Sequence, residues 1–252
     1  MSINLVNRKR AFVIAEAGTC HFAESIGERI GLANKHVKAA AEAGADAIKF
    51  QIFDDPNPET MFCWIDGDEN RVDRWKGSRL GIAQWMYVKR YAEDLGITFL
   101  ASVFENTTVS WLNKLKVDAY KVASRAAKNF PYKKVPGPFL IANGMHNLFN
   151  VTLDPDTYCI MQCEARYPSI TRWKGHSSQP GFSDHSANQW YAIDAMFRGC
   201  KMVEVHFKID DEYAGPDLPA SLTVDQLRLI CEARDAITKL PHIYALSEIP
   251  FA

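Results

Sequence analysis

Short apolar runs of strand length recur along almost the whole chain. Eight of them are predicted to be β-strands, at residues 11–18, 47–53, 98–104, 119–124, 138–144, 158–165, 180–186 and 202–208. Amphipathic stretches lie between several of these runs, with apolar residues at helical spacing from Ile30, Ile82, Ile193 and Val224 onward. Gly44, Gly96 and Gly199 stand where three of these helices should end. The pattern predicts repeated β/α units.

Eight such units in 252 residues, without a glycine-rich dinucleotide motif after the first strand, indicate a TIM (β/α)8 barrel of the α/β class rather than a doubly wound sheet. The connections after strands four, five and six are poor helices, with Pro131 and Pro136 in the first and Pro155 in the second. We therefore expect a trimmed barrel, with short or missing helices after strands 4 to 6. No linker divides the chain, so residues 1–252 are expected to form a single catalytic barrel domain. The long segment 54–81 is expected to cover the active site.

Charge and composition narrow the choice of partners. The chain carries 29 Lys and Arg against 30 Asp and Glu, so it lacks the electrostatic footprint of a nonspecific nucleic-acid or membrane-surface binder. Residues 1–10 contain no signal-peptide core, and no run of about 18 apolar residues occurs. The six cysteines include no CxxC pair, which is typical of reduced thiols. We expect a soluble cytoplasmic protein that binds small molecules.

Polar residues gather at the C-terminal ends of the predicted strands, where a TIM barrel keeps its catalytic groups. Residues two apart on a strand face the same side, so several of these side chains share one face. The polar strand ends comprise Glu16, Lys49, Gln51, Ser102, Lys121, Ser124, Ser183, His185, Glu204 and His206. We expect them to line one cavity.

Two pairs within this set have competing interpretations. Lys49 and Lys121 are costly to bury unpaired, so with the nearby serines they favour a phosphate or carboxylate cradle over two lysines that reach solvent independently. His185 and His206 fit a metal or acid/base pair as well as they fit two hydrogen-bonded structural histidines. The residues alone leave that second choice open.

Several motifs along the chain resemble those of a known family. They are IAEAG (14–18), AGADAIKFQ (43–51), ASVF (101–104), AYKVAS (119–124), NGM (143–145), YP (167–168), FSDHS (182–186), EVHF (204–207) and GPDLPAS (215–221). In this order and spacing they resemble the sialic acid synthase family, through a barrel domain of the N-acetylneuraminate synthase type. The resemblance covers about residues 11–240. It implies condensation of phosphoenolpyruvate with the aldehyde form of an aminosugar such as N-acetylmannosamine, yielding a sialic-acid-type nonulosonic acid and phosphate.

The resemblance also implies roles for particular residues. His185 and His206 would bind a divalent metal, most often Mn²⁺, with Mg²⁺ or Co²⁺ as alternatives. Lys49, Lys121, Ser102, Ser124 and Ser183 would hold the carboxylate and phosphate of phosphoenolpyruvate. The sugar would meet Gln51, Tyr167 and Asp217, and acid/base or supporting groups would be Glu16 and Glu204.

Departures from the family pattern leave other functions open. Arg125 and Ala126 stand where Gly-Glu is usual, and Ala142 and Ala165 replace polar residues. Arg125 and Arg166 are expected to compensate by binding an anionic ligand in the cavity. The alternatives are a noncatalytic binding or scaffold protein on a degenerate barrel, and another metal-dependent barrel aldolase or isomerase.

The end of the chain carries a further expectation. The family's C-terminal antifreeze-like domain is not expected here, because the sequence stops about a dozen residues after the last predicted helix. An oligomer, if one forms, would therefore use other surfaces than that domain.

Overall fold

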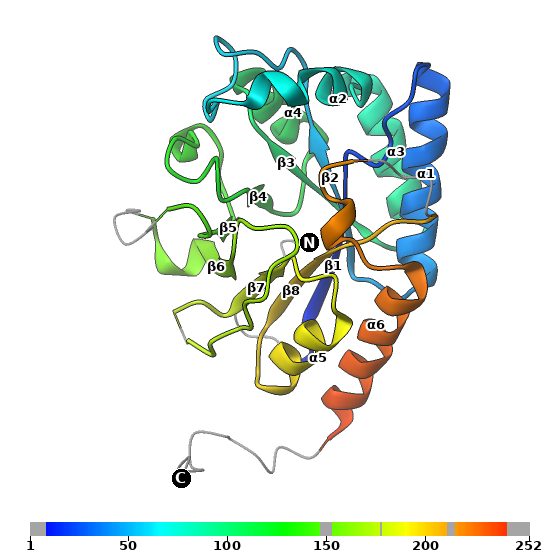
Figure 1. Ribbon diagram of the computed structural model, residues 1–252, viewed down its shortest axis with the longest axis vertical. Helices are drawn as coiled ribbons and strands as arrows, with labels where there is room; N and C mark the ends of the chain where they lie inside the picture. The colour runs from blue at the N-terminus through cyan, green and yellow to red at the C-terminus, as the bar shows by residue number, and fades with distance from the viewer. Residues whose placement is uncertain (1–8, 147–152, 177, 211–214, 241–252) are drawn as a thin grey trace.

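The eight predicted strands form a closed parallel barrel. The computed structural model describes residues 9–146, 153–176, 178–210 and 215–240. The strands are β1 (Phe12–Gly18), β2 (Ala47–Ile52), β3 (Thr98–Val103), β4 (Tyr120–Val122), β5 (Phe139–Ala142), β6 (Tyr158–Cys163), β7 (Gly181–Asp184) and β8 (Met202–His206). They pair in sequence order, and β8 closes the barrel on β1. The predicted TIM barrel of the α/β class is confirmed (Figure 1).

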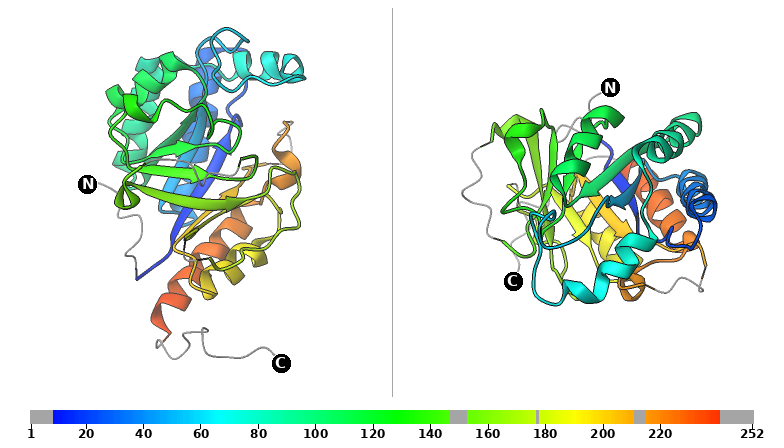
Figure 2. Two further views of the ribbon diagram at one scale, coloured as in Figure 1. Left: turned by 90° about the vertical axis from the view of Figure 1, so that its left-hand side faces the viewer. Right: turned by 90° about the horizontal axis from the view of Figure 1, so that it is seen from above.

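Helices cover only part of this barrel. They are α1 (Ile26–Glu42), α2 (Val72–Gly77), α3 (Ile82–Asp94), α4 (Asn106–Leu115), α5 (Gln189–Phe197) and α6 (Val224–Lys239). Among the described residues, the connections after β4, β5 and β6 contain no α-helix and two short 3-10 turns, η2 (Tyr132–Lys134) and η3 (Pro155–Thr157). Figure 2 shows the strands of this flank without a covering helix layer. The trimmed barrel is confirmed, and the prolines explain it because a proline in a helix interior lacks the backbone donor.

Local signals account for several helix boundaries. Ser25 and Thr223 form capping boxes with Glu28 and Gln226, which begin α1 and α6. The three glycines predicted at helix ends all have positive φ, between 72° and 97°. Helix α4, which was not predicted, begins after Glu105 without a side-chain cap.

The side chains inside the barrel form two layers. The layer nearer the N-terminal ends of the strands is apolar and consists of Phe12, Ile14, Ala47, Leu100, Ala119, Leu140, Cys159, Met161 and Met202. Two residues further along the same strands, on the same face, come polar side chains such as Glu16 after Ile14 and Glu204 after Met202. The polar groups therefore stand on a closed apolar floor, which lets them face only the C-terminal mouth of the barrel.

An ion-pair cluster joins the last helix to the start of the barrel. Arg234, only 1% exposed, donates to Asp46 Oδ2 at 2.7 Å, to Asp235 Oδ1 at 2.9 Å and to the Gly44 carbonyl at 3.0 Å. Arg10 pairs with the same two carboxylates at 2.6 and 2.8 Å. The cluster fixes α6 against the β2 entry.

Arg234→Met is expected to lower the free energy of unfolding by about 3 kcal/mol, because it removes one partner from a buried ionic network. Urea unfolding measures this change. The matched control is Arg228→Met, since Arg228 pairs with Asp225 on the exposed face of the same helix, and we expect it to stay within about 0.5 kcal/mol of the parent. A loss below about 1 kcal/mol for Arg234→Met would show that the cluster is not structural.

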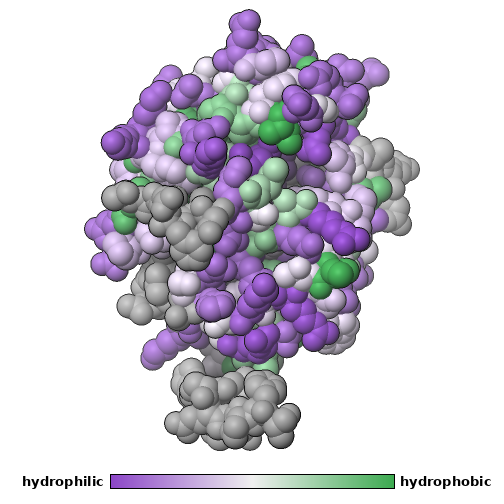
Figure 3. All heavy atoms as spheres, turned by 60° about the vertical axis from the view of Figure 1, so that its left-hand side comes forward, coloured by the Kyte–Doolittle hydropathy of each residue, from purple (hydrophilic) through white to green (hydrophobic). Residues whose placement is uncertain are grey.

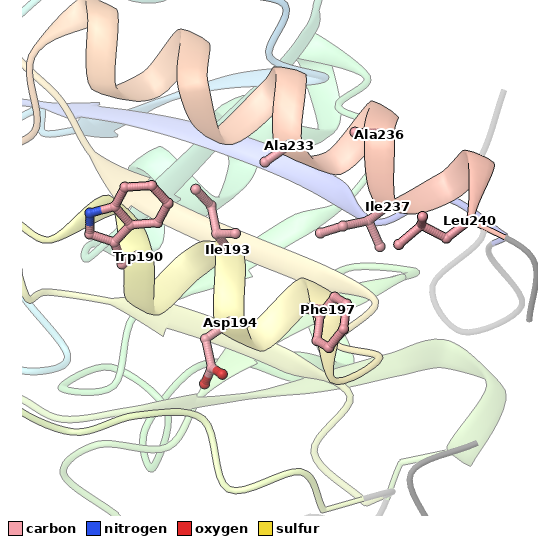
Figure 4. Close-up of a pocket in the computed structure, with 8 residues that line it drawn as sticks. All are labelled: Trp190, Ile193, Asp194, Phe197, Ala233, Ala236, Ile237 and Leu240. Atoms are coloured by element: carbon pink, nitrogen blue, oxygen red, sulfur yellow. The ribbon is translucent and has the colours of Figure 1, made fainter. Parts of the chain in front are cut away.

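The molecular surface is mostly polar. Figure 3 shows hydrophilic residues over most of one face, with apolar residues in small separate patches. An apolar groove lies between α5 and α6, where Ile193 and Phe197 on α5 face Ile237 on α6 and Leu240 just after its end (Figure 4). Within the described residues, no helix is both long and apolar enough to cross a membrane.

Candidate active site

A cavity opens at the C-terminal ends of the barrel strands. It is lined by Glu16, Lys49, Gln51, Ser102, Phe104, Lys121, Ala123, Ser124, Ala142, Cys163, Tyr167, Ser183, His185, Glu204 and His206. The predicted site residues are all in this lining except Asp217, Arg125 and Arg166. Strand alternation explains the convergence, because the inward side chains of eight neighbouring strands meet at one level above the apolar floor.

Two lysines and two carboxylates form a buried network of ion pairs in the cavity. Lys49 Nζ lies 2.6 Å from Glu16 Oε2 and 3.6 Å from Glu204 Oε2. Lys121 Nζ lies 3.2 Å from Glu204 Oε1, and the Ser183 hydroxyl donates to that oxygen at 2.9 Å. All four charged side chains are at most 4% exposed. Each lysine therefore has the carboxylate partner that its burial demands.

The two carboxyl groups differ in their affinity for protons. Burial raises the pKa of Glu16, and although Lys49 opposes this, the nearby Glu204 adds to it. Burial also disfavours the charged form of Glu204, but Lys121 and Lys49 together outweigh burial and lower its pKa. At neutral pH the cavity thus holds one ionised carboxylate and one carboxyl group able to exchange a proton.

The two histidines stand side by side at the mouth of the network. The ring centroids of His185 and His206 are 5.2 Å apart. His185 Nδ1 lies 2.7 Å from the Glu164 carbonyl, which has no hydrogen to give, so Nδ1 carries the proton and Nε2 accepts. The Tyr167 hydroxyl lies 3.3 Å from this Nε2, and its ring stacks on the imidazole with centroids 4.3 Å apart. Burial lowers the pKa of both histidines to about 3, so both rings are neutral.

These donors suit a metal that is held loosely by the protein. Neutral imidazoles are good ligands for divalent metals, and the buried Nδ1 of His206 has no hydrogen-bond partner among the described residues. Asp217 Oδ2 lies 3.9 Å from that nitrogen. The described part of the chain contains no group of three or more His, Cys, Asp and Glu side chains placed to hold a metal. The residues therefore fit an open site with two protein nitrogens, and they do not fit a closed structural site.

Asp217 reaches the rim because a glycine makes room for it. Gly18 ends β1 with φ +53°, and a Cβ atom there would lie only 2.8 Å from Asp217 Oδ2. The same carboxylate oxygen accepts from Gln51 Nε2 at 3.4 Å, and burial raises the pKa of Asp217. Gln51 and Asp217, both predicted to meet the sugar, are thus brought together.

The structure departs from the expectation for the two arginines. Arg125 turns away from the cavity and pairs with Asp68 in segment 54–81, because that buried carboxylate is within reach. Arg166 is exposed, beside the Glu164 carboxylate, and does not line the cavity. Neither guanidinium supplies the compensation that we expected from the sequence.

Sequence reasoning missed several members of the lining. Cys163 lies two residues beyond Met161 on the inward face of β6, and strand alternation could have identified it. Its sulfur is 3.8 Å from His185 Nδ1, and burial raises the pKa of the thiol to about 11. Phe104 follows β3 and forms an apolar part of the wall, where no polar signal marked it.

Comparison with known proteins shows one consistent likeness. The model of the NeuB family matches residues 36–241. The chain is 26% identical to an N,N'-diacetyllegionaminic acid synthase of Campylobacter jejuni, over 88% of this chain and 75% of that protein. It is 28% identical to the human N-acetylneuraminate-9-phosphate synthase, over 86% of this chain and 67% of that protein.

A solved structure has the same fold. The N-acetylneuraminic acid synthetase of Leptospira borgpetersenii, in complex with citrate, superposes with a TM-score of 0.77 at 21% identity. The match covers 100% of this chain and 93% of the other. At this identity the likeness concerns the fold alone.

Proposed function

The chain belongs to the NeuB family, and from that premise we propose that it condenses phosphoenolpyruvate with the open-chain form of an aminosugar such as N-acetylmannosamine. The products are a nonulosonic acid of the sialic type and inorganic phosphate. The relatives named as synthases of legionaminic acid and of N-acetylneuraminate 9-phosphate support this class of reaction. The free cysteines, with no disulfide among the described residues, support a cytoplasmic location.

One observation carries the proposal. Two lysines with charged ends at most 4% exposed stand above an apolar floor, beside a row of serine hydroxyls and open to a single mouth. Glu16 and Glu204 offset the cost of burying these ammonium groups, and because both groups also line the cavity they can donate hydrogen bonds to an anion that enters it. A small molecule with a phosphate and a carboxylate matches two lysines and several hydroxyl donors better than a neutral sugar does.

One group of cavity residues is proposed to bind phosphoenolpyruvate and another to bind the sugar. Lys49 and Lys121 offset the charges of phosphoenolpyruvate, and Ser102, Ser124 and Ser183 contribute hydroxyl groups to its binding. Ser183 does so by turning its hydrogen away from Glu204 Oε1. Ser102 already accepts from Lys49 at 3.1 Å, which keeps the ammonium aligned across β2 and β3. On the other side of the mouth, the proposed sugar ligands are Gln51, Tyr167 and Asp217.

The reaction makes one carbon–carbon bond and replaces one carbon–oxygen bond at C2 by another, while the aldehyde oxygen takes up a proton and becomes a hydroxyl group. C3 of phosphoenolpyruvate attacks the aldehyde carbon of the sugar, water adds to the cationic C2, and phosphate leaves with the oxygen that joined it to C2. Glu16 accepts the proton of the attacking water, since its raised pKa suits it to exchange protons near neutrality. Lys121 and Lys49 stabilise the negative charge on the departing phosphate.

A divalent metal completes the proposed site. His185 and His206 would hold it, with Mn²⁺ as the first candidate and Mg²⁺ or Co²⁺ as alternatives. When bound, such an ion supplies Lewis-acid polarisation of the aldehyde oxygen.

The test is phosphate release by the purified protein with Mn²⁺, phosphoenolpyruvate and a panel of hexosamines, pentoses and phosphosugars. We expect release with at least one aldehyde acceptor and none without an acceptor. The Lys49→Met variant serves as the inactive control, because it removes one of the two cationic ligands. Calorimetry adds a second readout with phosphoenolpyruvate and Mn²⁺ alone. Absence of both binding and phosphate release with every acceptor would contradict the proposal and favour a noncatalytic scaffold.

A further inference from the structure

Arg125 joins the cavity wall to segment 54–81. It directly follows Ser124, which lines the cavity, but its guanidinium lies outside. One amino group pairs with Asp68 Oδ2 and also donates to the Cys63 carbonyl at 3.1 Å. Its guanidinium carbon lies 5.7 Å from the centre of the Trp75 ring. One side chain from the end of β4 thus contacts three points of this segment.

The ion pair between Arg125 and Asp68 is almost completely shielded from solvent. The Arg125 side chain is 13% exposed and the Asp68 side chain 2%. Asp68 also accepts from the Ile65 amide at 3.1 Å, so the same carboxylate shapes the turn that presents it. A pair that is shielded from solvent and hydrogen-bonded in this way specifies one position, because any other position leaves a charge buried without its partner.

Neighbouring contacts connect segment 54–81 to the wall of the cavity. The Phe62 amide donates to the Phe104 carbonyl at 3.1 Å. Trp75, which lies under Arg125, stacks on Phe53 with centroids 5.1 Å apart, and Phe53 stacks on Phe104 at 4.9 Å. Phe104 lines the cavity. Arg125 is therefore connected to the lining twice, through the backbone to Ser124 and through the aromatic stack to Phe104.

The far end of the segment is anchored on the other side of the mouth. Arg74 donates to the Thr19 carbonyl at 3.1 Å and to its hydroxyl at 3.2 Å. His21 Nε2 lies 2.6 Å from the Ser78 carbonyl. Segment 54–81 thus contacts the barrel both near the end of β1 and near the end of β4. The pair between Arg125 and Asp68 makes the contact near β4.

We propose that Arg125 is a positioning residue, and that its ion pair with Asp68 is a latch that holds segment 54–81 on the barrel and thereby fixes Ser124 and Phe104 for substrate binding. The last step rests on the proposed function. The latch itself is a property of the fold and is tested without any substrate.

The test compares Arg125→Met, Asp68→Asn and the double variant. Hydrogen exchange of the amides in residues 61–75 measures the segment, and alkylation of Cys163 by iodoacetamide measures access to the cavity. Cys163 is suitable because it lines the cavity, and peptide mass spectrometry separates its labelling from that of Cys63, the buried cysteine of segment 54–81. We expect both rates to rise at least about tenfold, which corresponds to about 1.4 kcal/mol of lost closing free energy.

The double variant separates the latch from two independent side chains. If the two residues act as one pair, the double variant behaves like either single variant. The matched control is Arg228→Met, which breaks an exposed ion pair on α6 and should change neither rate. Thermal unfolding of each variant, compared with the parent, tests whether its barrel is folded.

Substrate readouts complete the design. Calorimetry should show weaker binding of phosphoenolpyruvate in all three variants, and KM should rise more than kcat falls. Unchanged hydrogen exchange in the single variants would overturn the latch. Faster exchange with unchanged Cys163 labelling and unchanged phosphoenolpyruvate binding would overturn its positioning role. If the parent protein does not bind phosphoenolpyruvate, the proposed function fails, and exchange and labelling still decide the latch.

Discussion

His206→Ala is expected to abolish metal-dependent turnover while the barrel stays folded, and His185→Ala should do the same. The two imidazoles are the proposed protein ligands, they are neutral, and their ring centroids lie 5.2 Å apart. Mutation of a residue that only supports a metal ligand already costs about 10- to 100-fold in metal affinity or activity. Loss of one of two ligands should exceed this range. Calorimetry with Mn²⁺ alone and phosphate-release kinetics measure the two effects.

His36→Ala is the matched control for these variants. His36 is also a buried histidine with a lowered pKa, but it packs on Phe207 outside the cavity. It should lower stability and leave Mn²⁺ affinity unchanged. Near-parental turnover of His206→Ala or His185→Ala, with an unchanged metal requirement, would contradict the metal assignment.

Lys121→Ala is expected to raise the dissociation constant for phosphoenolpyruvate by roughly 10- to 150-fold, with a smaller effect on the sugar. A hydrogen bond to a charged group contributes about 1.5 to 3 kcal/mol, which converts to that range. Lys121 is 2% exposed and has Glu204 Oε1 at 3.2 Å, so its removal also leaves a buried carboxylate with one fewer cation. Isothermal titration with each substrate separately measures the two affinities.

Lys128→Ala removes the same charge from an exposed position on the connection after β4. It should bind phosphoenolpyruvate like the parent, which separates local contact from net charge. A loss of affinity confined to the sugar in Lys121→Ala would instead assign this lysine to the acceptor side of the cavity.

Part of the cavity could be predicted because strand geometry is a local property. Alternation placed Lys49 and Gln51 on one face of β2, and Glu204 and His206 on one face of β8, and the structure has all four in the lining. The same rule would have identified Cys163 had it been applied to β6. The prolines after β4 and β5 likewise predicted the missing helices, since a helix interior requires the backbone donor that proline lacks.

The sequence by itself thus determined the strands of the barrel, its open flank and the polar strand ends, because each depends on a residue pattern within one strand or one connection. Only the tertiary structure decided how charges pair across that ring. Arg125 had the cavity on one side and segment 54–81 on the other, and the buried carboxylate of Asp68 is its partner. Asp217 reaches Gln51 only because Gly18 leaves room for it. Such choices depend on the distances between segments far apart in sequence and on the burial of the charged groups, which together set the Coulomb attraction and the cost of desolvation.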